Sequence, residues 1–90
     1  MSYHLHFTRH AQQDINFHKK SGNKTLLKKM LLLLKEISEH PFTGEGKPKP
    51  LVHELVGMWS KRINQEHRIV YEVLNDIVVI HSTKGHYFQK

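Results

Sequence analysis

The chain has 90 residues, of which 38% are hydrophobic, and it carries a formal net charge of +6 at pH 7 with histidine neutral. A single domain spanning residues 1–90 is expected, because this apolar content suffices for a packed core and argues against a disordered tail. The chain lacks cysteine, which excludes disulfides, thiolate chemistry and cysteine-based zinc sites. The basic balance favours polyanionic partners, most simply nucleic acid, although an acidic protein partner also fits the charge.

No segment of the sequence predicts a membrane span or a secretory signal. The longest apolar run, residues 30–34, is far too short to cross a bilayer. Residues 1–8 lack the apolar core of a signal peptide. We therefore expect a cytoplasmic protein with no membrane partner.

The chain opens with a predicted strand and a first helix. Residues 3–7 alternate between apolar side chains and histidine, as in a strand with one apolar face. Thr8 can cap a helix that starts at Arg9 and continues, with a weak apolar stripe, over residues 11–20. The tripeptide Ser21-Gly22-Asn23 ends this helix.

A much stronger helix is predicted over residues 24–39. Its apolar side chains recur at helical spacing, which predicts a core-facing stripe. This stripe comprises Leu26, Met30, Leu33 and Ile37, with Leu27, Leu31 and Leu34 beside them. The helix ends at His40-Pro41, because the residue before a proline avoids helical geometry. The short turn between the two helices predicts a helical hairpin laid on one face of a sheet.

The second half of the chain predicts a loop followed by strands. Residues 42–50 are rich in glycine, proline and lysine and predict a loop. A short strand is expected around residues 53–55. Residues 58–64 and 67–74 then alternate with period two, as strands do, on either side of a polar turn at Gln65-Glu66.

The dipeptide Asn75-Asp76 predicts a hairpin into the last strand, residues 77–82. The apolar side chains on both faces of this strand are typical of a central, covered position. The order β-α-α-β-β-β-β predicts an α+β fold, in which an N-terminal strand and a two-helix hairpin pack on a mostly antiparallel sheet.

The two middle runs divide apolar from charged side chains. Trp59 and Ile63 share one face of the first run, and Arg62 lies on the other face with Ser60. In the second run the apolar face holds Ile69, Tyr71 and Val73, and the other holds Arg68 and Glu72. Two arginines projecting from one sheet face, beside a lysine-rich loop, form a candidate anion site.

More ordinary interpretations fit the same residues. Arginines at this spacing are more often solvated, or paired with carboxylates such as Glu66 and Glu72. Trp59 is most simply a core residue, although it could also anchor a dimer or a partner segment. His4 and His6 share a strand face, but no third ligand stands at the required spacing, so we expect no metal site.

Four blocks in collinear order resemble the YoeB/Txe family of bacterial toxins, within the RelE/ParE superfamily. They read P-F-T-G-E-G-K-P, L-V-H-E-L-V-G-M-W-S-K-R-I, E-H-R-I-V-Y-E-V and a late G-H-Y. The resemblance is strongest over residues 41–73 and at His86-Tyr87. It implies a small RelE/ParE-like domain that acts as a ribosome-dependent mRNA interferase. Such an endoribonuclease cuts messenger RNA in the ribosomal A site without metal or cofactor, by attack of the RNA 2′-hydroxyl on the adjacent phosphate.

The resemblance also implies partners. A cognate YefM/Phd-like antitoxin would neutralise the toxin, and operator DNA would be bound only through the toxin–antitoxin complex. The ribosome and messenger RNA would be the other partners. Toxins of this family are often dimers, which implies a homodimer by analogy.

The resemblance implies a site that includes five positions. Arg68 would hold the scissile phosphate and stabilise the charge of the transition state. His86 would be the general acid for the 5′-oxygen leaving group. Tyr87 would stack on a base or hydrogen-bond the phosphate, and Lys47 and Arg62 would bind backbone phosphates. Without the resemblance, His86 and Tyr87 could equally belong to a frayed terminus.

One position departs from the family pattern. The family motif G-K-P-E-P carries a glutamate as general base, whereas this chain reads G-K-P-K-P and has Lys49 there. A lysine is protonated near neutral pH unless strongly desolvated. We expect Lys49 to neutralise phosphate at the catalytic site, while the role of base passes to His86 or a nearby glutamate such as Glu66, or is lost.

Two alternative functions follow from these residues. A catalytically weakened toxin would act as an antitoxin-binding module and operator corepressor. A ParE-like gyrase inhibitor on the same fold is disfavoured by His86-Tyr87 and by the G-K-P loop, which resemble the RNA-cleaving branch.

Overall fold

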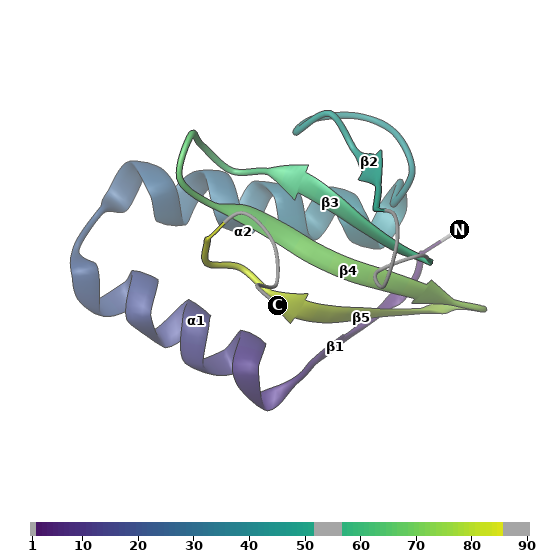
Figure 1. The fold of residues 1–90 in the computed structure, drawn as a ribbon, viewed down its shortest axis with the longest axis horizontal. Helices are drawn as coiled ribbons and strands as arrows, with labels where there is room; N and C mark the ends of the chain where they lie inside the picture. The colour runs from purple at the N-terminus through teal and green to yellow at the C-terminus, as the bar shows by residue number, and fades with distance from the viewer. Residues whose placement is uncertain (1, 52–56, 86–90) are drawn as a thin grey trace.

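The computed structural model describes residues 2–51 and 57–85, in which two helices cover one face of a five-stranded sheet (Figure 1). The elements are β1 (His4–Phe7), α1 (Arg9–Ser21), α2 (Lys24–Glu39), β2 (Lys49–Pro50), β3 (Met58–Arg62), β4 (Arg68–Leu74) and β5 (Ile77–Ser82). The strand order is β1-β5-β4-β3-β2. Strand β1 runs parallel to β5, and the other neighbouring pairs are antiparallel. The predicted α+β fold with a mostly antiparallel sheet is confirmed.

Local signals in the sequence set the bounds of both helices. The side chain of Thr8 accepts a hydrogen bond from the Ala11 amide at 3.0 Å, so the predicted cap of α1 is present. Asn23 caps α2 in the same way, through the Leu26 amide at 3.0 Å. Between them, Gly22 has a φ of 77°, a left-handed conformation that glycine adopts without steric cost. The chain therefore reverses direction within the predicted breaker.

The core lies between α2 and the sheet. The buried residues of α2 are Leu26, Met30, Leu33, Leu34 and Ile37. The expectation that Leu31 belongs to this stripe is wrong, because its side chain is 58% exposed. Leu31 lies about a third of a turn around the helix from the centre of the stripe, beyond the face that meets the sheet. Leu32, on the other flank, is 55% exposed.

The predicted strands are confirmed with shorter ends. Strand β3 ends at Arg62 and strand β4 starts at Arg68, because residues 63–67 form the turn between them. Strand β5 lies between β1 and β4, as expected of a central strand. The prediction of a loop over residues 42–50 is wrong at its end, where Lys49 and Pro50 pair with β3. Proline is tolerated there because β2 is an edge strand.

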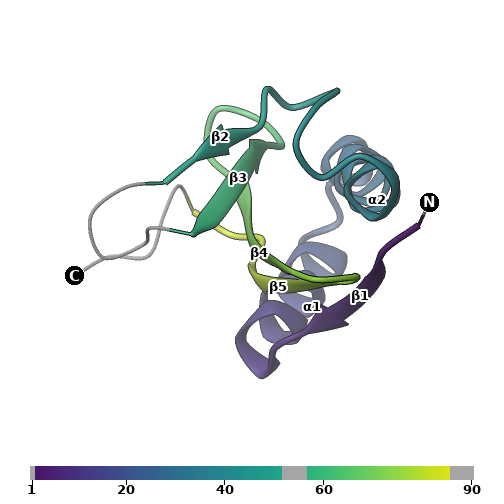
Figure 2. The same ribbon diagram turned by 90° about the vertical axis from the view of Figure 1, so that its right-hand side faces the viewer.

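The strand predicted around residues 53–55 lies outside the described residues. Seen end-on, the sheet is strongly twisted and both helices lie on the same side of it (Figure 2). That side is the apolar core, so functional side chains must come from the other face, from the loops or from the sheet edge.

Candidate functional site

The arginines predicted from the alternating pattern lie directly opposite each other. Arg62 on β3 pairs in register with Arg68 on β4. One row further along the sheet, Lys49 pairs with Ser60, which in turn pairs with Val70. Direct partners in an antiparallel pair project to the same side, and positions two apart share a face. Lys49, Arg62 and Arg68 therefore share the face away from the helices, which we call the charged face.

Facing arginines favour a bound anion. Like charges directly opposite each other on neighbouring strands are destabilising on their own, and a phosphate accepts hydrogen bonds from two guanidinium groups at once. Arg62 is exposed and Arg68 is half-buried. The floor beside them includes Ser60, whose buried hydroxyl has no hydrogen-bond partner in residues 2–51 and 57–85. The charged face thus combines exposed positive charge with an unpartnered polar group.

Two carboxylates in and beside the arginine-bearing strands, those of Glu66 and Glu72, contact histidines. Glu66, in the turn between β3 and β4, contacts His67 Nε2 at 3.8 Å, and its side chain is 82% exposed. Glu72 contacts His81 Nε2 at 3.2 Å across β4 and β5. The turn keeps Glu66 near the strand ends that carry Arg62 and Arg68.

The chain returns to Arg68 after β5. The amide of Arg68 donates a hydrogen bond to the Gly85 carbonyl at 2.7 Å. The amide of Gly85 donates in turn to His67 Nδ1 at 2.9 Å. Two bonds thus fix Gly85 against the start of β4. The predicted site residues His86 and Tyr87 follow Gly85 in the sequence and lie outside the described residues.

A buried lysine that the sequence analysis missed holds the loop of residues 41–48. Lys61 Nζ donates hydrogen bonds to the carbonyls of Thr43 at 2.8 Å and His40 at 3.3 Å. It also lies 3.6 Å from Glu36 Oε1, and its side chain is fully buried. Burial lowers the pKa of Lys61 below its usual value, although the charge of Glu36 opposes this shift. The sequence could have indicated this burial, because Lys61 lies two residues after Trp59 and therefore on the same, core-facing side of the strand.

Further contacts fix the same loop against α2 and β3. Glu36 Oε1 accepts a hydrogen bond from the Glu45 amide at 2.7 Å. The Gly46 carbonyl accepts one from the Arg62 amide at 2.8 Å. Gly46 has a φ of 81°, which favours glycine, and a Cβ added there would also lie only 3.0 Å from Lys61 Cβ. The loop therefore carries Lys47 in a fixed position at the edge of β3.

Trp59 is half-buried against the core and also contacts the ring of Phe42, which is exposed. Within residues 2–51 and 57–85, no group of three histidine or acidic side chains could hold a metal ion. In the same residues, no helix is long and apolar enough to cross a membrane.

The chain matches known proteins over most of its length. A family model described as the YoeB-like toxin of bacterial type II toxin-antitoxin systems matches residues 7–87. Toxin YoeB from Synechocystis sp. is 48% identical over 66 residues, which is 73% of this chain and 77% of that protein. A YoeB dimer from Staphylococcus aureus has a TM-score of 0.84 at 36% identity, covering 97% of this chain and 100% of that chain. A YoeB–YefM complex from the same species has a TM-score of 0.82 at 38% identity, with the same coverage.

The helical hairpin on one face of a mixed sheet, together with these matches, identifies the chain as a toxin of the RelE/ParE superfamily. Within that class, the chain belongs to the YoeB-like toxin family of bacterial type II toxin-antitoxin systems.

Proposed function

We propose that this protein is a ribosome-dependent mRNA interferase that cuts messenger RNA in the A site without a metal ion. One observation carries the proposal: Arg62 and Arg68 pair directly across the charged face, where one phosphodiester could accept hydrogen bonds from both guanidinium groups. The supporting observation is that Gly85, directly before His86 in the sequence, is hydrogen-bonded to Arg68. Family membership adds to this support.

In the proposed reaction the 2′-oxygen of one nucleotide forms a bond to the adjacent phosphorus, and the bond from phosphorus to the 5′-oxygen breaks. The products are a 2′,3′-cyclic phosphate and a free 5′-hydroxyl. Arg68 stabilises the negative charge that accumulates on the phosphate oxygens. His86 donates a proton to the departing 5′-oxygen. Tyr87 stacks on a base or hydrogen-bonds the phosphate.

Lys49 and Lys47 contribute positive charge to the site and do not remove the proton of the 2′-hydroxyl. Lys49 is exposed on the edge strand, one row from the arginine pair, so its ammonium group can neutralise phosphate. The proton of the 2′-hydroxyl then goes to another base. Glu66 is a candidate, because the turn holds it near the arginine-bearing strand ends and its carboxylate is exposed.

We further propose that a YefM/Phd-like antitoxin neutralises the protein, since a YoeB of Staphylococcus aureus has been solved with YefM. Operator DNA would be bound only through that complex. A homodimer is proposed on the same basis, from the YoeB dimer of that species.

The test maps the 3′ ends formed on a translated messenger by purified protein and ribosomes. We expect new ends within the A-site codon, lost in His86→Ala and reduced on the order of 10²–10³-fold in Arg68→Gln. Lys28→Gln is the matched control, because Lys28 is exposed on the far side of α2. This variant should cleave the messenger as the parent does.

A second function is favoured by one observation, the lysine at position 49 where the family motif has glutamate. In this alternative, the protein is a weakened toxin that serves as an antitoxin-binding operator corepressor. An intact messenger, together with retained antitoxin binding, would support this alternative and contradict the nuclease.

A further inference from the structure

A hollow of about 510 Å³ lies beside the charged face, between α2, the loop of residues 41–48 and the end of β3. The charged residues that line it are Lys29, Glu36, Glu45, Lys47 and Arg62. Arg62 is thus shared between the hollow and the arginine pair. The hollow is an extension of the candidate site toward α2, and its lining includes a helix residue that no motif singled out.

The charges around the hollow leave an excess of positive charge at its rim. Glu36 is compensated, because its carboxylate contacts the buried ammonium of Lys61 and accepts a hydrogen bond from the Glu45 amide. Glu45 lies 3.8 Å from Lys29 Nζ, and its side chain is 63% exposed. An exposed pair at this distance contributes little stability. A more highly charged anion can therefore displace Glu45 from Lys29 at small cost.

We propose that this hollow is a second phosphate subsite, which binds a backbone phosphate of the RNA strand next to the linkage held by Arg62 and Arg68. Lys29 and Lys47 provide the point charges that phosphate contacts require. Buried Lys61 keeps the wall of the hollow in place. The assignment of the bound strand as messenger RNA rests on the proposed function. The preference of the hollow for phosphate rests only on the charged residues that line it.

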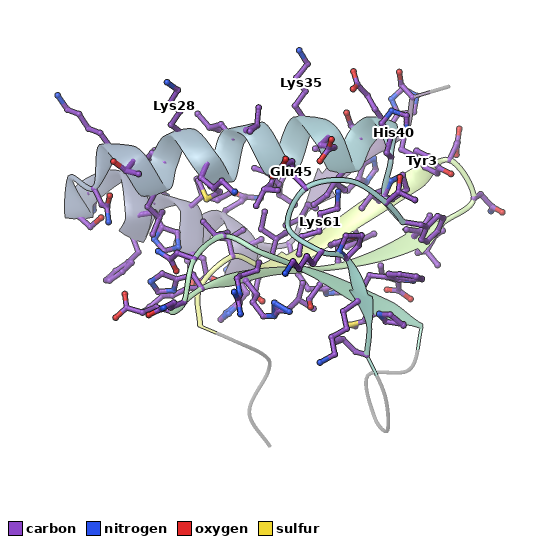
Figure 3. The ribbon with its side chains drawn as sticks, turned by 90° about the horizontal axis from the view of Figure 1, so that it is seen from above. Tyr3, Lys28, Lys35, His40, Glu45 and Lys61 are labelled. Atoms are coloured by element: carbon purple, nitrogen blue, oxygen red, sulfur yellow. The ribbon has the colours of Figure 1, made fainter. Side chains whose placement is uncertain are left out.

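The neighbouring lysines of α2 provide a matched pair of variants. Lys28 projects from α2 away from the rest of the molecule (Figure 3). Lys29 lines the hollow. The two lysines are consecutive residues of α2 and carry the same charge. Lys28→Gln and Lys29→Gln therefore change the net charge of the protein equally, but Lys29→Gln alone changes the hollow.

The experiment measures binding of a short single-stranded RNA in which 2′-methoxy groups prevent cleavage, at several salt concentrations and without ribosomes. We expect Lys29→Gln to weaken binding several-fold and to make the slope of log K against log salt shallower by about 0.7, the value of one lost phosphate contact on a single strand. Lys28→Gln should leave the slope unchanged. Glu45→Gln should tighten binding, because it removes the competing carboxylate.

Equal effects of Lys28→Gln and Lys29→Gln would overturn the subsite, since they would indicate net charge alone. An effect of Lys29→Gln on ribosome binding only would overturn the assignment to a single strand. Because this RNA is not cleaved, a failure of the nuclease proposal leaves the result interpretable. Thermal unfolding of each variant provides the folding control, and we expect little change because Lys29 and Glu45 are solvent-accessible.

Discussion

Lys61 and Arg62 are consecutive cations on β3, and the structure gives them opposite surroundings. Lys61 points to the helix-covered face, where its side chain is fully buried and its ammonium contacts two carbonyls and Glu36. Arg62 points to the charged face, where it is exposed and faces Arg68. The first cation already has its oxygen partners within the protein. The second lies where an external anion can reach it.

The contrast shows how one strand can hold a loop in place with one side chain and expose a cation to solvent with the next. Lys61 holds the loop that carries Lys47 toward the charged face, and Arg62 holds the same loop through its backbone amide. A buried ammonium is costly to desolvate, so it persists only where several oxygens compensate it. The structural role of Lys61 and the proposed ligand-binding role of Arg62 are therefore separated by the pleat of the strand rather than by distance along the chain.

The largest expected effect on stability comes from removing the buried cation. Lys61→Met keeps most of the length of the side chain but leaves the Thr43 and His40 carbonyls without their donor and Glu36 without its ion-pair partner. We expect a loss of about 2 kcal/mol in the free energy of unfolding, measured by urea denaturation. Arg62→Met, on the other face, should change stability by less than about 0.5 kcal/mol. Similar losses in the two variants would contradict the division of roles.

The pH dependence sharpens this test. Because burial lowers the pKa of Lys61, the unfolded chain binds more protons than the folded chain between that lowered pKa and 10.5. Stability contributed by this group therefore rises with pH across that window. Lys61→Met should lack this rise, whereas Arg62→Met should retain it.

A charge reversal on the opposite face should have the next largest effect. Lys49→Glu restores the residue type that the family motif places there, on the same face as the arginine pair. We expect cleavage on ribosomes to become about tenfold faster, since a positioned base contributes to removal of the 2′-hydroxyl proton. The single-turnover rate constant is the measurement. An unchanged or slower rate would show that Lys49 does not occupy the position of a base.

Sequence patterns predicted the elements whose signals are local. The bounds of α2 matched because Asn23 caps its start and His40-Pro41 ends it. The bounds of β5 matched because a hairpin signal precedes it. Arg62 and Arg68 were correctly placed on one face, since alternation is a property of single strands. Their direct pairing depends on the register across the turn, which the sequence did not specify.

The parts that were missed depend on packing between distant segments. Lys61 was overlooked because a lysine at a core position contradicts the apolar pattern, and its partners come from α2 and the loop. Leu31 was placed beside the core-facing stripe by its helical spacing, but its side chain is 58% exposed because the sheet does not reach that flank of the helix. Lys29 lines the proposed subsite because the loop lies against that flank of α2, which no local pattern predicts. The periodicity of a sequence predicts which side chains share a face of a helix or strand. It does not predict which distant segment packs against that face.

The smallest expected effect concerns Tyr71, which lies beside Lys61 on the helix-covered face and also fastens the loop. The hydroxyl of Tyr71 donates a hydrogen bond to the Pro41 carbonyl, and burial raises the pKa of Tyr71 well above 10.0. Above pH 10 the unfolded chain loses this proton while the folded chain keeps it, so stability falls as pH rises. Tyr71 should therefore account for a loss of about 1 kcal/mol between pH 10 and 11.

Tyr71→Phe separates this contribution from the other alkaline titrations, which the parent and the variant share. At pH 8 the variant should be less stable by about 1 kcal/mol, because the Pro41 carbonyl loses its donor. Toward pH 11 the two unfolding free energies should converge, as the parent loses the advantage of its bound proton. Urea unfolding at both pH values measures the difference. A constant gap would mean that the hydroxyl titrates alike in both states, and then loop attachment from the helix-covered face would depend on Lys61 rather than on Tyr71.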